Sequence, residues 1–484
     1  MFDPFLSVIS SPDIVYPAAD DFFSPNEAYP EYRYATVSGV SNPVYRAVRN
    51  VFAQAGLDKE YLGKADWNPL AVFIPPGSRV FVLCNFVYHR RLGEDKPTFW
   101  AKCTHGSVLR AVLDYVLIAT GPEGRVLFGN APLQSCDWNA VLRDSGAQCV
   151  LDFYRERDVD VQAHDLRRFT ALRNLLGGVK ETENRELADV VEFDLGRESL
   201  LAQLDSLHPR YRVTDYNPRR TEYYQDSGRH VYAVNREILE TDVIFSVPKL
   251  KTHEKVGITC NLKGMVGTIA LKDCLAHHRF GSPREGGDEY PESSRVLHML
   301  SEFHEGACTN GRAGSKANLK RIVDVNLRRI AVRSGKILAG AWYGNDTAWR
   351  MALDIARVVT YGDADGRLHT EPQRKHIGLV DGIVGGEGDG PLDPRPVPSG
   401  TLIFSDDLVL GDRACCAVMG IDPEKIPLVR EGASLRSFPI AKGASDQVPI
   451  YINGSRSTLA QLSALCRRPF LCPRGWRRHL AAAV

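Results

Sequence analysis

Short runs of consecutive apolar residues recur along this chain, and each of them ends at polar residues. The clearest runs are RVFVLCN (79–85), RVLFGNAP (125–132), CVLDF (149–153) and TDVIFSVP (241–248), and stretches with helical periodicity such as 106–121 lie between them. Strands that are apolar on both faces and alternate with helices are typical of a parallel sheet covered on both sides. We therefore expect an α/β fold with two parallel-sheet halves and a ligand cleft between them.

The composition changes along the chain and indicates five segments. They are an N-terminal extension (1–70), a first α/β half (71–153), a polar insertion or subdomain (154–235), a second α/β half (236–430) and a C-terminal segment with a basic tail (431–484). Within the second half, the polar stretch of residues 281–318 is predicted to be a lid or loop. Further helices are expected at residues 44–56, 138–144 and 349–360.

The overall charge of the chain is balanced, with 60 Lys and Arg against 59 Asp and Glu. This balance creates no global field that would attract nucleic acid, so any anion must be bound by a local cluster of cations. The N-terminal residues carry Asp3 and Pro4 where a signal peptide would be basic, and no apolar run reaches the ~20 residues that span a bilayer. We expect a cytoplasmic protein without a membrane span and leave its oligomeric state open.

Eleven cysteines are scattered from Cys84 to Cys472, and none of them belongs to a CxxC pair. An iron–sulfur cluster needs closely spaced thiolates, which this sequence lacks. We therefore expect reduced, mostly buried cysteines and no iron–sulfur cluster.

The strongest functional pattern is a cluster of Lys and His directly after the apolar run that ends at Pro248. Its members are Lys249, Lys251, His253, Lys255, Lys263, Lys272, His277 and His278, within about 30 residues. Pro248 cannot donate a ladder hydrogen bond, so the strand is predicted to end there and the cations to lie on the loop that follows. Most lysines are solvated surface residues, but a cluster that follows a buried strand favours a binding site at the strand end.

Each residue type in this cluster suggests a role. Lys249 and Lys251 are candidates for binding a phosphate, carboxylate or enolate, and His253 is a candidate for proton transfer. Lys263 is a candidate catalytic residue, because the pKa of a lysine falls when other cations crowd it and the amine then becomes a nucleophile. His277 and His278 are candidate metal ligands, although adjacent histidines are often incidental.

Polar residues at other strand ends complete the predicted site. Asn85 and Asn130 follow the first two apolar runs and are candidates for substrate binding, as is Asp381 in VDGIVGGEGDGP (380–391). Glu387 and Asp389 of the same glycine-rich segment could bind a divalent cation, or they could cap a tight turn. Three further carboxylates are expected to cap the helix that follows residue 407: Asp406, Asp407 and Asp412.

Several of these segments together resemble the domain-of-unknown-function 362 (DUF362) family. The resemblance is carried by DVIFSVPKLKTHEKVGITCNLKGMVG, VDGIVGGEGDGP, SDDLVLGDRACCAVMGIDP and the two opening strands, and covers residues 79–430. Many members of the family carry a ferredoxin-like cysteine domain, but this chain departs from that pattern. The spacing of His253, Lys263 and His277 is also similar to that of the nickel-pincer lactate racemase family. That similarity would make His253 the acid or base, Lys263 the cofactor-bearing amine, and His277 or His278 a nickel ligand.

These observations predict an enzyme that acts on a small carboxylate or phosphate in a cleft lined by Lys and His, with metal-assisted proton transfer as one form of its chemistry. The cofactor is left open between a divalent metal and a pincer nucleotide. One alternative is a non-catalytic module that binds an anion or cofactor or takes part in assembly. Another is an iron–sulfur-family relative that has lost its cluster domain.

Overall fold

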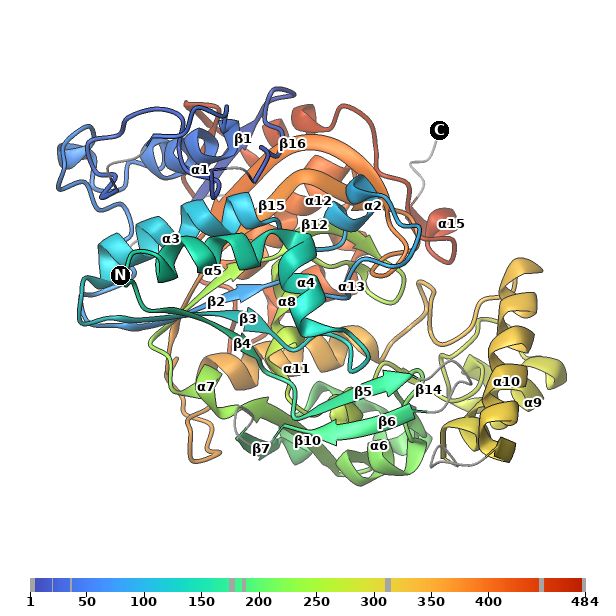
Figure 1. Ribbon diagram of the computed structural model, residues 1–484. Coiled ribbons are helices and arrows are strands. Elements are labelled where there is room, and N and C mark those ends of the chain that lie inside the picture. The colour runs from blue at the N-terminus through green and yellow to red at the C-terminus, as the bar shows by residue number, and fades with distance from the viewer. Residues whose placement is uncertain are drawn as a thin grey trace.

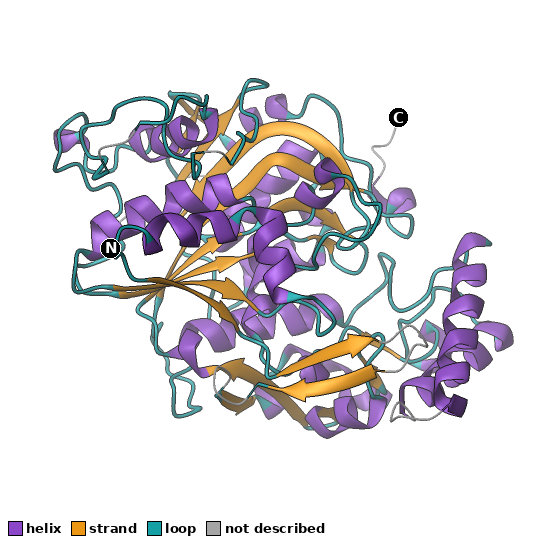
Figure 2. Ribbon diagram, viewed as in Figure 1, coloured by secondary structure: helices purple, strands orange, loops and turns teal. Residues whose placement is uncertain are grey.

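The computed structural model describes residues 5–19, 21–34, 37–173, 179–184, 189–309, 315–443 and 448–480. The fold is α/β, and its centre is one large sheet with helices on both faces (Figures 1 and 2). Five neighbouring strands are parallel: β15 (Lys375–Glu387), β11 (Val243–Val247), β2 (Arg79–Cys84), β3 (Arg125–Asn130) and β4 (Val161–Asp165).

β16 and strands from both ends of the described chain extend this sheet beyond β15. They follow in the order β16 (Arg395–Ser405), β1 (Leu6–Ser10), β17 (Ile450–Ile452) and β18 (Ser455–Ser457). β16 is antiparallel to β15 and to β1, whereas β1 is parallel to β17. The strands of the two predicted halves therefore lie in one continuous sheet, and a division into two halves with a cleft between them is not confirmed.

Successive side chains of a parallel strand point to opposite faces of the sheet, and this explains why these strands are apolar at every position. Val80 and Val82 of β2 pack in one buried cluster with helices α1, α3 and α5, whereas Phe81 and Leu83 pack in another with α11 and α12. A side-chain period of two sends successive residues to opposite faces, and here both faces are covered by helices. The prediction of a doubly covered parallel sheet is thus confirmed.

The described helices agree in most places with the helical periodicity of the sequence. Their bounds are α1 (Pro43–Gln54), α2 (Lys96–Trp100), α3 (Gly106–Thr120), α4 (Trp138–Ser145), α5 (Ala147–Arg155), α6 (Pro218–Tyr224), α7 (Arg236–Leu239), α8 (Cys260–Gly264), α9 (Arg295–Thr309), α10 (Ser315–Arg333), α11 (Ala348–Tyr361), α12 (Leu408–Met419), α13 (Pro427–Ser434), α14 (Leu459–Leu462) and α15 (Arg477–Leu480). None of these described helices is long and apolar enough to cross a bilayer.

Two predictions of secondary structure were wrong. Residues 149–153 belong to helix α5, whose buried side chains Ala147, Val150, Phe153 and Tyr154 follow helical spacing that a five-residue window hides. The stretch 281–318, predicted as a lid or loop, contains α9 and the start of α10 in its described part, and residues 310–314 lie outside the described residues.

The predicted polar insertion starts with β4, which belongs to the main sheet, and its other strands form small sheets beside it. β7 (Val190–Asp194), β10 (Arg229–Asn235) and β9 (Gln225–Asp226) form one of them, and β5 (Phe169–Arg173) pairs with β6 (Val179–Glu183). β8 (Tyr211–Arg212) pairs with β14 (His278–Arg279), which comes from the second predicted half. The insertion is therefore linked by a strand pair to the segment that carries the cation cluster.

Candidate functional site

The cation segment is a buried part of the fold. After Pro248 the chain forms β12 (Lys249–His253), which runs parallel to β15, and then β13 (Gly257–Ile258) and helix α8. All five residues of β12 are buried. The expectation that pairing ends at Pro248 was wrong: β11 ends there, but the chain resumes pairing with the same neighbour, with an irregular register between Lys249 and Lys251.

A large cavity of about 1700 Å³ lies against this segment. Six of its lining residues belong to the predicted cluster: Lys251, His253, Lys255, Lys263, Lys272 and His277. Asn85 and Asn130, predicted from the ends of β2 and β3, line the same cavity. Parallel strands that end at one edge of a sheet bring these side chains together, as predicted.

The four cavity-lining lysines of this segment form no ion pair with any described residue. Lys251 Nζ donates to the carbonyl oxygen of Lys102 at 2.9 Å, and Lys272 Nζ donates to that of Ala131 at 2.7 Å. Lys255 Nζ donates to the carbonyl oxygen of Ala339. Backbone carbonyls carry only partial charge, so these contacts orient the amines without neutralising them.

Burial, assisted by neighbouring cations, changes the protonation of these amines. It lowers the pKa of Lys251 to about 7 and that of Lys272 to about 7. Burial and the nearby Lys255 lower the pKa of Lys263 to about 8. Because desolvation disfavours the charged form, an anion in the cavity would raise these pKa values again and favour the ammonium ions.

The two histidines of the cation segment that line the cavity, His253 and His277, are held as opposite tautomers. Burial and the neighbouring lysines keep the pKa of both His253 and His277 well below the ordinary value, so both rings are neutral at pH 7. His253 Nδ1 accepts a hydrogen bond from the backbone N–H of Lys255 at 3.1 Å, which leaves the proton on Nε2. His277 Nδ1 donates to the carbonyl oxygen of Leu275 at 3.0 Å, which leaves the lone pair on Nε2. His253 therefore offers an Nε2–H donor, and His277 offers an Nε2 acceptor.

Residues 203–417 match the family model described as Domain of unknown function (DUF362). The similarity to DUF362 inferred from the sequence is thus confirmed over this part of the chain. No curated protein and no solved structure is significantly similar to the chain. The similarity in spacing to the nickel-pincer racemases is therefore not confirmed.

The DUF362 domain supplies most of the cations but not the whole cavity. β12, α8 and the segment up to His277 lie within residues 203–417, whereas Asn85 and Asn130 precede the domain and Arg474 follows it. Asn85 Nδ2 donates to the carbonyl oxygen of Lys102 at 2.7 Å. Asn130 Nδ2 donates to that of Phe86, and its buried Oδ1 has no hydrogen-bond partner among the described residues.

Lys249 and Asp381, both predicted to bind substrate, do not line the cavity of the DUF362 domain. They form a buried ion pair with each other at 2.9 Å, and both side chains are 0% exposed. Tyr16 Oη donates to Asp381 Oδ1 at 2.6 Å and the backbone N–H of His105 donates to Oδ2 at 3.1 Å. The geometry gives this pair a structural role, and its role in substrate binding stays a prediction without support from the cavity.

The four predicted metal ligands lie in different environments. Glu387 forms an ion pair with Arg468 at 2.7 Å, and Asp389, which lines the large cavity, forms one with Arg474 at 2.7 Å. His278 lies on β14 and lines a neighbouring small cavity, whereas His277 lines the large one. The free Nε2 of His277 suits a metal as well as a proton, so the metal-binding role of these residues stays a prediction.

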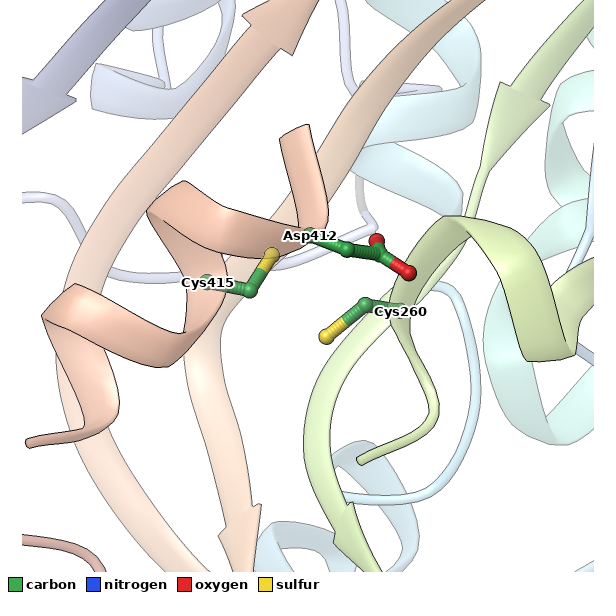
Figure 3. Close-up of side chains that lie close together, drawn as sticks. All are labelled: Cys260, Asp412 and Cys415. Atoms are coloured by element: carbon green, nitrogen blue, oxygen red, sulfur yellow. The ribbon is translucent and has the colours of Figure 1, made fainter. Parts of the chain in front are cut away.

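Another group of donor atoms, in the part of the chain that the structure describes, is close enough to share an ion. Cys260, Asp412 and Cys415 place a ligand atom each within 4.8 Å of one another (Figure 3). Asp412 already accepts hydrogen bonds from the backbone N–H groups of Asn261 at 2.7 Å and Leu262 at 3.0 Å. Burial raises the pKa of both thiols, so they are protonated and neutral. These hydrogen bonds explain why the three side chains lie together: Asp412 caps the start of α8, and the two neutral thiols pack beside it.

The capping role of Asp412 corrects a prediction. Asp407 caps α12, since its Oδ1 accepts from the backbone N–H of Leu410 at 2.9 Å, as expected. Asp406 instead accepts from the backbone N–H of Phe5 at 2.9 Å and pairs with Lys442. Asp412 lies inside α12, so it cannot cap that helix and reaches across to α8. The sequence indicates where α12 begins, but it does not indicate that α8, which is distant in the chain, packs against it.

Sequence reasoning missed the cations at the outer part of the cavity. They are Arg219, Arg220, Arg321, Arg328, Lys336, Arg474 and Arg478. They come from α6, α10, the segment after α10 and the C-terminal tail, which are far apart in the sequence. No local pattern marks them, because only the tertiary fold brings them to one cavity.

Proposed function

We propose that this chain is an enzyme that binds a small carboxylate or phosphate in the cavity of its DUF362 domain and moves a proton on that substrate. The observation that carries the proposal is the group of four buried amines that line one cavity without an ion pair to any described residue. Burying amines without counter-charges is costly, and proteins accept that cost most often at functional sites.

The electrostatics favour an anionic ligand. Lys251 and Lys272 approach the cavity from β12 and from the segment before β14, and their amines are held by backbone carbonyls. A carboxylate or phosphate between them would supply the missing negative charge and form charge-assisted hydrogen bonds. Since both amines are buried, such bonds would be screened less by water than the same bonds at the surface.

Proton transfer is the chemistry that the histidines support. The Nε2 lone pair of His277 is a base, and the Nε2–H of His253 is a donor for an oxygen that becomes negative. The amine of Lys263 and those of its neighbours would stabilise the same negative charge. A proton next to a carboxylate or carbonyl group is the kind of proton that such a site can remove.

Anion binding is tested by calorimetry with inorganic phosphate and simple carboxylates on wild-type protein and on Lys251→Met, Lys272→Met and Lys59→Met. Lys59 is exposed and lies outside the cavity, so its variant is the matched control. We expect the first two variants to bind at least about tenfold more weakly, since one charge-assisted hydrogen bond contributes about 1.5–3 kcal/mol. Equal affinities in all four proteins would contradict the proposal.

Catalysis is tested separately with His277→Gln and His253→Gln against a panel of small hydroxy and oxo acids in deuterium oxide. Exchange of a substrate C–H for deuterium, followed by NMR, reports proton transfer without knowledge of the product. We expect exchange in the wild-type protein and its loss in His277→Gln with anion binding retained. Binding without exchange in the wild-type protein would identify a non-catalytic binding module instead.

A further inference from the structure

Lys263 differs from the other buried lysines of the cation segment because its amine has no partner among the described residues. Lys249 is paired with Asp381, and the amines of Lys251, Lys255 and Lys272 each donate to a backbone carbonyl. Lys263 Nζ makes no hydrogen bond and no ion pair with any residue that the structure describes, although the residue is only 9% exposed and lines the cavity. An amine that is buried, unpaired and open to a cavity is available for chemistry.

The backbone beneath Lys263 is fixed in place. Helix α8 begins at Cys260, and Asp412 holds the N–H groups of Asn261 and Leu262 at its start. Gly264 follows Lys263 and lies next to Pro248, the residue between β11 and β12, so the helix packs near the start of the strand that carries Lys251 and His253. The lysine therefore projects from a short, anchored helix into the cavity.

The groups around Lys263 suit an amine that reacts while neutral. Its electrostatic neighbours in the cavity are cations and neutral imidazoles: Lys255 disfavours its ammonium form, and Lys263 in turn disfavours protonation of His253 and His277. A base with a free lone pair, His277 Nε2, lies in the same cavity. An amine whose neutral form is favoured, in the same cavity as a base, is what a nucleophilic lysine requires.

We propose that Lys263 Nζ forms an imine with the carbonyl carbon of an anionic carbonyl compound, such as a 2-oxo acid, whose carboxylate is held by Lys251 and Lys272. This inference rests on the proposed anion-binding function and names the substrate class of that site. It selects Lys263 because this amine is unpaired, whereas Lys251 and Lys272 are oriented as anion-binding groups.

The reaction balances without an oxidant or cofactor. The Nζ lone pair attacks the carbonyl carbon, the C=O π bond breaks, and the carbonyl oxygen takes a proton from solvent to give a carbinolamine that is still protonated on nitrogen. His277 Nε2 accepts a proton from nitrogen and returns it to the hydroxyl group, which leaves as water while the C=N bond forms. The resulting iminium ion withdraws electrons from the adjacent C–H bond, so the proton that the site would remove becomes more acidic.

The experiment is reductive trapping on the full chain. Wild-type protein is incubated with glyoxylate, pyruvate, 2-oxoglutarate or pyridoxal phosphate and treated with borohydride, which adds hydride to the C=N bond and makes the adduct stable. Intact mass and peptide mapping then locate the modified lysine. We expect at least one of these compounds to label Lys263 at least about tenfold more than the exposed Lys59, because an amine whose pKa is lowered has a larger neutral fraction at pH 7.

Two variants and a competitor make the result decisive. Lys263→Arg keeps a positive charge but cannot form an imine, so it should lose the label while it still binds phosphate by calorimetry; Lys59→Arg should keep the label. Lactate, which has no carbonyl carbon of this kind, should compete with the label without forming an adduct. Mapping on the wild-type protein does not depend on how the Lys263 variant folds.

The failures of the two proposals are distinguishable. If phosphate and carboxylates bind but none of the four carbonyl compounds labels Lys263, or if another lysine carries the label, the imine proposal is wrong and the anion site remains. If no anion binds, the proposed function is wrong as well.

Discussion

The amines of Lys251 and Lys272 should make the stability of the ligand-free protein depend on pH. Each has a pKa of about 7 in the folded protein, whereas an unfolded lysine has about 10.4. Between these values the unfolded chain binds more protons than the folded one, so the free energy of unfolding rises as the pH rises from about 7 to about 10 and falls as the pH is lowered. Urea denaturation at several pH values should show this rise, and Lys251→Met with Lys272→Met should flatten it. If the free energy of unfolding of the double variant still rose equally with pH, the lowered pKa values of the Lys251 and Lys272 amines would be contradicted.

Lys249 and Asp381 should matter for stability mainly because neither charge can stay buried without the other. Their mutual attraction should add little net stability. Asp381→Ala leaves the Lys249 amine buried and unpaired, so we expect a loss of about 3–5 kcal/mol in the free energy of unfolding. Replacing both residues, as Lys249→Met and Asp381→Leu, should recover a large part of that loss. Denaturant unfolding of the single and double variants measures the coupling, and additive losses would show that the pair is not coupled.

At the scale of single elements, two helix caps provide a matched comparison. Asp407 caps α12 and Asp412 caps α8, but only α8 carries Lys263. Asp407→Ala should lower stability by about 1 kcal/mol and leave anion affinity unchanged. Asp412→Ala should lower stability and also weaken anion binding, because the start of α8 loses its anchor. Calorimetry and denaturation on both variants check this, and equal effects on affinity would show that the cap does not position the site.

The elements that the sequence predicted well are those whose surroundings leave a local pattern. β2, β3 and β11 are covered on both faces, so their residues are apolar in unbroken runs. Helix α10 was not predicted because several of its apolar side chains are exposed and a charged one is buried, which is the reverse of the usual amphipathic pattern. Its exposed side chains include Leu319, Ile322 and Ile330, while the buried Asp324 bonds His304. Polarity alone therefore suggested a loop where the chain is helical.

The same reasoning explains how much of the site was predictable. The inner cations lie close together in the sequence because β12, β13 and α8 follow one another without a long connection, so a local cluster predicted the cavity. The structural use of Lys249 was not predictable, because its partner Asp381 lies on β15 and the pairing depends on the register of β12 against that strand. The outer arginines likewise depend on how α6, α10 and the C-terminal tail meet.

At the scale of the whole molecule, the cavity is assembled from segments that the sheet brings together. Its lining includes residues 85–87 after β2, residues 130–135 at and after the end of β3, and residues of the cation segment from Lys251 to His277. The backbone N–H of Ala131 donates to the carbonyl oxygen of Gly267 at 2.6 Å, so two of these segments are also bonded to each other. A ligand that fills the cavity should therefore order all of them at once.

Hydrogen exchange with and without saturating phosphate should show this coupling. We expect slower exchange in all of these lining segments, because contacts with a shared ligand suppress local opening in each of them. Strands β17 and β18, which lie at the far edge of the sheet from β3 and β4, are the internal control and should not change. Protection confined to the cation segment would mean that the anion is bound by that segment alone, and that the strand ends carrying Asn85 and Asn130 take no part in the site.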